Sequence, residues 1–400
     1  MADSGVVTRL RRALPWWVSV SLVFLASRVV STALLLYFAS IQQANAWTGQ
    51  HPGYFEYAKI WDGNWYWIVA ASGYPSELPL TPDGHVAENA WAFLPAYPML
   101  VRLLMTVTGA SFDVVAVFVS VAFAWGAALL FYTLMKTALP AGSALFAVVL
   151  FCVAPLSPML QVAYPESMFA FLLTLCLYLL VKRRYVLIIP VVTVMAFTRP
   201  GALALALAMG LHVVHRLVTR DPFPVRERVA AIGSTLYTAL AGFFWLLAAW
   251  AATGNLHAYT DTELAWRMPY IGYVELVPLT PWVQGANWWG ATWGWPDWLG
   301  VTVLVVIVAG FAAFMFSPWV RRLGVDIRFW VASFALYILA VFFPQSSVFR
   351  ILMPTFPLLG AFAVPRSPSF RIAIVLAFVA LQAWWLSIGW WVNGYDWTPP

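Results

Sequence analysis

Charged residues are scarce in this sequence. They make up 10% of its 400 residues, whereas a soluble globular domain normally carries about 25%. Hydrophobic residues make up 62%, and the mean hydropathy is +0.80. This composition excludes a soluble globular protein. Because the apolar runs are long and alternating strand patterns are absent, helices are the expected spanning form, and we predict an all-α polytopic membrane protein.

Cysteine is almost missing as well. Cys152 and Cys176 are the only two, and both lie in apolar runs, which excludes a disulfide framework and a thiolate metal cluster. The five histidines form no HExxH or comparable pattern, and neither a Walker loop nor GxGxxG occurs. We therefore expect no cofactor and no essential metal.

Two further absences concern partners and location. No basic patch with base-stacking aromatics emerges, so the net charge of +6 does not indicate a nucleic-acid partner. No Asn-x-Ser/Thr sequon occurs, which favours a bacterial plasma membrane over the secretory pathway. Internal repeats and low-complexity segments are absent too.

The basic residues predict a topology. Arg9, Arg11 and Arg12 precede the first apolar run, 16–41, which indicates a cytoplasmic N-terminus. Arg28, near the middle of this run, should face protein or a water-filled cavity because a charge is costly in lipid. About eleven spans are expected in all. The others are 113–136, 141–156, 167–181, 185–198, 201–217, 229–252, 298–317, 327–344, 351–364 and 372–392.

The segment 93–108 is short and contains Pro95, Pro98 and Arg102. We interpret it as an interfacial helix, because a span here would place Lys182, Arg183 and Arg184 outside, against the positive-inside rule. The chain is then a single domain, 1–400, with an external C-terminus at Pro400. Its external loops, 42–112 and 253–297, are expected to form the active-site face.

The first external loop contains the run Trp61-Asp62-Gly63-Asn64-Trp65-Tyr66. An aspartate among aromatic rings suits a sugar, because rings stack on C–H faces while the carboxylate takes hydroxyl protons. The same carboxylate could act as a general base. A helix cap or an interfacial carboxylate is the structural alternative.

Arginines at the predicted outer ends of spans point to an anionic ligand. Arg199 and Arg350 can each grip a phosphate bidentately, and Arg267 lies nearby in the topology. Snorkelling toward the membrane interface is the alternative for each. Glu166 can contact substrate or simply favour the helix N-terminus that follows it. The candidate substrate-binding residues are Trp61, Trp65, Tyr66, Glu56, Glu166 and Trp266.

Six motifs follow one another along the chain: WDGNWYWIVAASGYP, AFLPAYPMLVRL, YPES, TRPGAL, TGNLHAYTDTELAWR and SSVFRILMPTFPL. In this order, over nearly the whole chain, they resemble the PIG-V-like mannosyltransferase family of GT-C glycosyltransferases, including its bacterial relatives. YPES departs from the more familiar Y-S-E-S form, and TRPG departs from forms with Asn after Arg-Pro.

The resemblance implies a GT-C-like membrane enzyme that takes a sugar, expected to be mannose, from a polyprenyl-phosphate donor. Transfer to a lipid-linked or glycolipid acceptor would occur at the external face, with inversion and without an essential metal. Asp62 carries over as the general base. A transporter or flippase of lipid-linked sugars would use similar residues, but it would be expected to show polar residues on both sides and often internal repeats.

Overall fold

The computed structural model describes residues 14–393. The predicted cytoplasmic arginines Arg9, Arg11 and Arg12, and the predicted external terminus at Pro400, lie outside the described residues. Within residues 14–393 the secondary structure is helical except for one isolated bridge between Leu80 and Val86. The predicted all-α class is therefore confirmed.

Five helical stretches are long and apolar enough to cross a membrane. They are α2 (Trp16–Ile41), α6 (Phe112–Met135), α11 with α12 (Val225–Ala241 and Phe244–Thr253), α16 (Asp297–Met315), and α21 (Pro368–Trp385) with the turn that extends it to Trp390. The chain is thus a multi-pass membrane protein. The number of spans and their orientation stay predictions.

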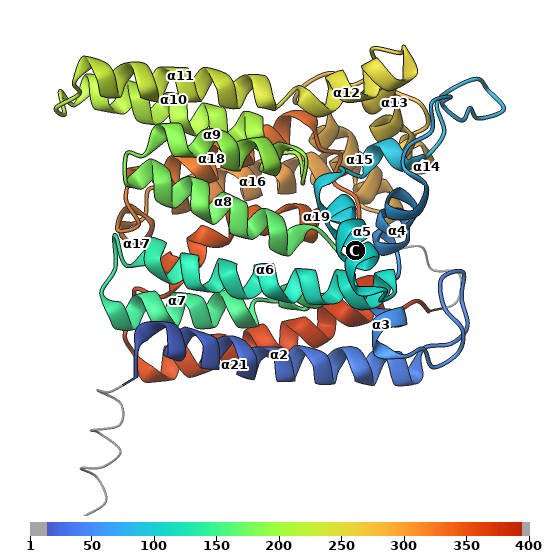
Figure 1. The fold of residues 1–400 in the computed structure, drawn as a ribbon, viewed down its shortest axis with the longest axis horizontal. Helices are drawn as coiled ribbons and strands as arrows, with labels where there is room; N and C mark the ends of the chain where they lie inside the picture. Colours follow the sequence, from blue (N-terminus) through green and yellow to red (C-terminus); the bar gives the residue numbers. More distant parts are fainter. Residues whose placement is uncertain (1–13, 394–400) are drawn as a thin grey trace, which may run out of the picture.

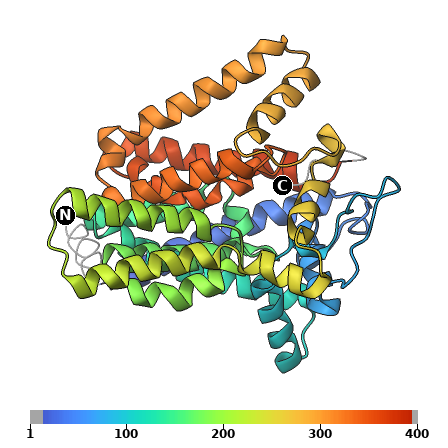
Figure 2. The ribbon, with the colours of Figure 1, turned by 90° about the horizontal axis from the view of Figure 1, so that it is seen from above.

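Shorter helices complete the bundle. They are α7 (Ala141–Val153), α8 (Glu166–Val181), α9 (Tyr185–Ala196), α10 (Ala202–Val218) and α18 (Val325–Val341). The long axes run side by side, with α2 and α21 along one edge and α10 and α11 along the opposite edge (Figure 1). The turn of the hairpin formed by α15 (Pro281–Thr292) and α16 projects away from the rest of the bundle (Figure 2).

The elements outside the long helices gather at one end of the bundle (Figure 1). They include α3 (Tyr54–Tyr57), α4 (Asp62–Ser72), α5 (Ala96–Thr108), α13 (Ala258–Ala265) and α14 (Met268–Ile271). Helix α5, the predicted interfacial helix, runs across the direction of the long helices (Figure 2). The two predicted external loops therefore meet at the same end of the molecule.

Small residues allow the central helices to approach closely. Ala124, Ala127 and Ala128 of α6 are fully buried, and a Cβ at Gly126 would come within 2.9 Å of the Phe171 ring of α8. Helices in lipid associate through such close packing, because the surrounding chains are as apolar as the side chains. Close packing against α6 thereby holds α8, including its N-terminal end, in place.

Arg28 illustrates how a charge is accommodated in the middle of a span. Its Nη1 donates to the Ser157 carbonyl at 2.8 Å and to Gln161 Oε1 at 3.0 Å, and its Nη2 donates to the Cys152 carbonyl at 2.8 Å. The Cys152 carbonyl belongs to the last turn of α7 and would otherwise lack a partner. As expected, this guanidinium faces protein and not lipid.

Candidate active site

Asp62 begins α4 at a strained turn. The Asp62 N–H donates to the Tyr164 hydroxyl at 2.9 Å, and this hydroxyl donates to the Ile60 carbonyl at 3.0 Å. Trp61 has a φ of 60°, a left-handed conformation that is rare for a bulky residue. Its ring packs on Trp47 with centroids 4.2 Å apart. The turn therefore sends Trp61 into the core and presents Asp62 on the other side.

Four charged side chains from distant parts of the chain meet at this point. Asp62 Oδ2 lies 2.7 Å from Arg350 Nη1, and the same Nη1 lies 3.2 Å from Glu166 Oε1. Arg199 Nη1 pairs with the same Glu166 oxygen. We call these four residues the arginine cluster. Helix α4, the N-terminus of α8, the α9–α10 connection and α19 (Val348–Ile351) each contribute one of them.

Burial and charge act together on the cluster. Burial raises the pKa of Asp62, and the neighbouring Arg350 guanidinium partly opposes this effect. Burial alone would lower the pKa of Arg350, but Asp62 and Glu166 together raise it above its usual value. Arg350 therefore remains a cation, while Asp62 is a stronger base than an exposed aspartate.

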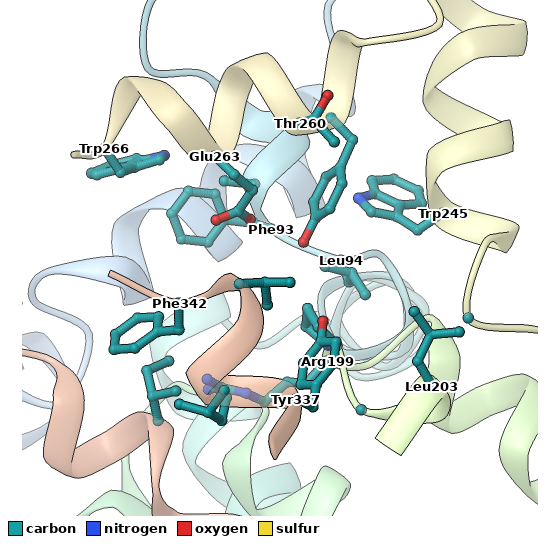
Figure 3. A pocket seen from close by; sticks show the side chains of 18 of the residues that line it. Phe93, Leu94, Arg199, Leu203, Trp245, Thr260, Glu263, Trp266, Tyr337 and Phe342 are labelled. Carbon is teal, nitrogen blue, oxygen red and sulfur yellow. The ribbon is translucent and has the colours of Figure 1, made fainter. Parts of the chain in front are cut away.

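A cavity of about 400 Å³ opens beside the cluster. We call it the polar cavity. Glu263, in α13, and Trp266, the C-cap residue of α13, lie on one side of the cavity. Arg199 and Tyr337 lie across from them (Figure 3). Further lining side chains include Asp62, Tyr66, Phe93, Trp245, Tyr259, Arg267 and Arg350.

A second cavity of about 330 Å³ shares Arg199, Arg350 and Pro354 with the polar cavity. Its other lining is almost wholly apolar, so we call it the apolar cavity. Phe349 and Phe362 on its lining are 45% and 38% exposed, which indicates that the cavity opens on the apolar outer surface. The remaining lining includes Phe151, Leu160, Phe169, Met353 and Phe356.

Several of the candidates from the sequence line the polar cavity. Asp62, Tyr66, Arg199, Trp266 and Arg350 are among them. Their assigned roles stay predictions.

The other candidates lie differently. Arg267 also lines the polar cavity, but its Nη2 donates to the Val274 carbonyl, and burial lowers its pKa. Trp65 stacks on Phe93, with centroids 5.4 Å apart, and therefore supports the wall from behind. Trp61 and Glu56 line neither cavity.

Glu166 lies between Arg199 and Arg350. It lines the apolar cavity and is 5% exposed, and its Oε2 has no hydrogen-bond partner within the described part of the chain. The carboxylate holds Arg199 and Arg350 side by side instead of facing the polar cavity. It therefore orients the two guanidinium groups.

Tyr259, Glu263 and Tyr337 also line the polar cavity and were not predicted from the sequence. The first two are four residues apart in TGNLHAYTDTELAWR, and residues four apart lie on one face of a helix. This spacing was the available signal. Nothing in the sequence around Tyr337, in the interior of α18, sets it apart from other aromatic residues in spans.

No family model matches this chain, and no curated protein matches it. Among solved structures, it is similar to the Archaeoglobus fulgidus oligosaccharyltransferase, determined in complex with Zn and sulfate, with a TM-score of 0.39 and 14% identity. The match covers 92% of this chain and 49% of that protein, so the chain spans about half its length. A functional interpretation therefore rests on the residues of the two cavities.

No group of three His, Cys, Asp or Glu side chains that could hold a metal ion occurs in residues 14–393. The expectation that the protein needs no metal stays a prediction. The charged groups available for chemistry in the two cavities are the arginine cluster, Arg267 and Glu263.

Proposed function

We propose that this protein is a GT-C-type glycosyltransferase that transfers a sugar, expected to be mannose, from a polyprenyl-phosphate donor. The acceptor is a lipid-linked or glycolipid molecule, and Asp62 is the general base. One observation carries this proposal: Arg199 and Arg350 stand where a polar cavity meets an apolar cavity, and Asp62 is paired with one of them.

The order of these features matches the order of groups in the donor. The phosphate of a polyprenyl-phosphate sugar lies between an apolar chain and a hydrophilic ring. Arg199 and Arg350 offer charge-assisted hydrogen bonds to the phosphate. The apolar cavity can take the first part of the chain, whose burial is favourable by about 0.8 kcal/mol per CH₂. The aromatic and carboxyl groups of the polar cavity suit the sugar. A soluble nucleotide sugar would have no use for the apolar cavity.

The proposed reaction balances without a cofactor. The acceptor hydroxyl oxygen forms a bond to the anomeric carbon, while its proton passes to the Asp62 carboxylate. The bond from the anomeric carbon to the phosphate oxygen breaks, and its electron pair remains on the polyprenyl phosphate. Arg199 and Arg350 stabilise that negative charge. The raised pKa of Asp62 favours proton removal near neutral pH.

Arg350 links donor binding to base strength. Its guanidinium is shared by Asp62 and Glu166. A donor phosphate that draws this guanidinium toward itself weakens the Asp62–Arg350 pair. An aspartate with a weaker cationic partner has a higher pKa. Asp62 would therefore become a better base once the donor is in place.

The test is a transfer assay with purified protein, radiolabelled polyprenyl-phosphate mannose and an extracted glycolipid fraction as acceptor. A labelled glycolipid and released polyprenyl phosphate are expected. The same protein is placed in liposomes that contain only the labelled donor. Movement of the donor across that bilayer, with no labelled product in the first assay, would contradict the proposal and support a flippase.

The location belongs to the same proposal. We place the protein in a bacterial plasma membrane, with a cytoplasmic N-terminus and both cavities at the external end. The distribution of basic residues supports this orientation.

A further inference from the structure

A second carboxyl group, Glu263, faces the polar cavity from α13. It lies one helical turn after Tyr259, and both side chains line the polar cavity. Among residues 14–393 no ion pair joins Glu263 to a basic group. In this respect it differs from both acids of the arginine cluster.

Rigid aromatic rings flank Glu263. Trp266 meets Phe93 edge to face at 5.8 Å and Trp65 at 5.7 Å. Trp245 is fixed by a hydrogen bond from its Nε1 to the Trp91 carbonyl at 2.9 Å. Figure 3 shows Trp266, Glu263 and Trp245 along the same side of the cavity. Ring packing and this hydrogen bond therefore hold the wall in place.

Charge selects the kind of group that this wall can bind. An ionised carboxylate that is not ion-paired with a basic group repels a phosphate, but it accepts hydrogen bonds from hydroxyl groups. Indole rings offer apolar faces to the C–H surfaces of a sugar. A neutral polyhydroxyl ring satisfies both requirements, and an anionic head group does not.

We infer that Glu263, Tyr259 and Trp266 form a binding site for a neutral sugar or polyol ring, across the polar cavity from the arginine cluster. The inference deepens the proposed function and rests on it for the identity of the ring, which is either the donor sugar or the acceptor head group. Glu263 is a specificity-determining residue in this arrangement. Asp62 remains the base.

The protonation of Glu263 gives this site a pH dependence. Burial raises its pKa to about 7, Tyr259 and Arg199 partly oppose the shift, and Asp62 adds to it. The other titratable or charged groups on the lining of the cavity are Tyr66, Arg267, Tyr337 and Arg350. Hydrogen bonds to a charged acceptor are stronger than those to a neutral one. Binding should therefore be tighter at about pH 8 than at about pH 6.

The first experiment measures binding without catalysis. Purified protein in nanodiscs is titrated with methyl α-mannoside, methyl α-glucoside and myo-inositol, and saturation-transfer NMR follows the ligand protons. We expect at least one of the three to bind. Glu263→Gln should weaken that binding about 10-fold or more, since a hydrogen bond to a charged group is lost. Tyr259→Phe is the second variant, and the exposed Glu77→Gln is the matched control.

The second experiment measures transfer kinetics. If the ring belongs to the donor, Glu263→Gln raises the donor KM, and if it belongs to the acceptor, it raises the acceptor KM. In either case the KM of the wild type should be higher at about pH 6 than at about pH 8. This difference in KM should disappear in the variant. A folded Glu263→Gln variant that binds the probe like the wild type would overturn the inference. So would wild-type protein that binds none of the three probes.

The two experiments separate the inference from the proposed function. Probe binding that depends on Glu263, in a protein that forms no transfer product, would leave the ring site standing and remove the glycosyltransferase proposal. Normal transfer with no dependence on Glu263 would do the opposite.

Discussion

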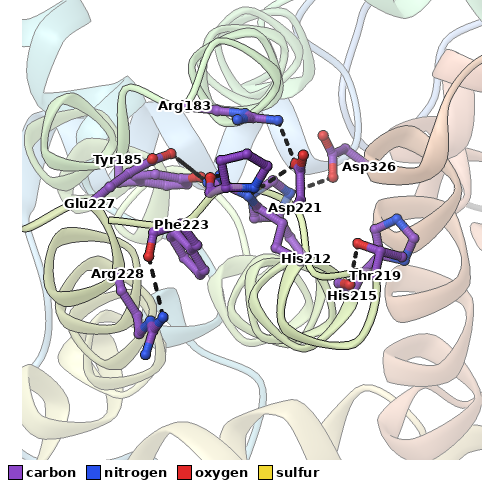
Figure 4. Close-up of polar contacts among 12 residues, drawn as sticks. Arg183, Tyr185, His212, His215, Thr219, Asp221, Phe223, Glu227, Arg228 and Asp326 are labelled. Carbon is purple, nitrogen blue, oxygen red and sulfur yellow. Dashed lines mark hydrogen bonds and ion pairs between the residues drawn. The ribbon is translucent and has the colours of Figure 1, made fainter. Parts of the chain in front are cut away.

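Two buried polar clusters lie at opposite ends of the helix bundle. One is the arginine cluster. The other, which we call the histidine cluster, consists of Tyr185, His212, Glu227 and Asp326 (Figure 4), together with Arg216. His212 Nδ1 lies 2.6 Å from Asp326 Oδ1, and His212 Nε2 lies 2.9 Å from the Tyr185 hydroxyl. Arg216 contacts the same hydroxyl at 2.9 Å and pairs with Glu227.

The clusters differ in what surrounds them. Neither the polar nor the apolar cavity is lined by any residue of the histidine cluster. Its members join the ends of α9, α10, α11 and α18. The Arg216 guanidinium also lies 4.0 Å from the centroid of the Phe223 ring, which closes the cluster on one side. Similar side chains therefore connect helices in the histidine cluster and line cavities in the arginine cluster. Buried ion pairs alone do not identify a ligand-binding site.

The largest contrast should come from Asp62→Asn. A general base contributes about 10²–10⁴-fold to the rate, whereas an asparagine caps a helix nearly as well as an aspartate. We expect kcat to fall by that factor, while Tm falls only modestly because Arg350 keeps Glu166 as an ion-pair partner. Radiolabel transfer and thermal unfolding measure the two quantities. Asp83→Asn, in an exposed loop, is the matched control. Near-normal turnover of Asp62→Asn would place the base elsewhere.

Arg216→Met should show the opposite behaviour. It leaves Glu227 without its guanidinium, and breaking a buried ion pair costs roughly 3–5 kcal/mol. We expect a lower Tm and a smaller yield of folded protein, with kcat per folded molecule unchanged. Arg184→Met replaces an exposed arginine at the same end of the bundle and serves as the control. A loss of kcat without a loss of stability would break the distinction between the clusters.

Arg350→Gln tests the donor side of the arginine cluster. Loss of a charge-assisted contact to phosphate should lower kcat/KM for the donor by roughly 10-fold or more. Initial rates at varied donor concentration measure this effect. Arg102→Gln, on the exposed face of α5, should leave the donor kinetics unchanged. Unaltered donor kinetics in Arg350→Gln would remove this residue from the phosphate site.

The smallest effect concerns the stability of Glu263→Gln. In the folded protein the pKa of Glu263 is raised to about 7, so the folded state holds this proton more tightly than the unfolded state does. The contribution of Glu263 to the free energy of unfolding is then fully present below the usual pKa of a glutamate, and it is lost as pH rises through about 7. We expect Glu263→Gln to raise Tm slightly at about pH 8 and to leave it unchanged at about pH 4. The gain is small because solvent in the cavity screens the charge.

Scanning calorimetry at several pH values would check this behaviour. An equal change in Tm at every pH would mean that Glu263 is not the titrating group. Together with the loss of ring binding, a gain in stability would show that this carboxyl is kept at a cost to folding, which is common for functional groups.

Hydropathy determined the helical class in advance, because a backbone in lipid must satisfy its own hydrogen bonds and helices do so within each segment. The charge near the middle of the first span also determined that Arg28 faces protein. The motif around Asp62 made that residue a candidate by its chemistry, because an aspartate among aromatic rings suits a sugar or a general base, and its role stays a prediction. These conclusions depend on local composition alone.

Directions and distances across the bundle required the tertiary structure. Trp61 and Asp62 are neighbours in the sequence, yet a left-handed turn held by Tyr164, about one hundred residues away, sends them to opposite sides. Glu166 lies between two arginines only because the start of α8, the α9–α10 connection and α19 come together in the fold. Long-range packing sets these relations, because the identity of a residue does not specify which distant side chains surround it.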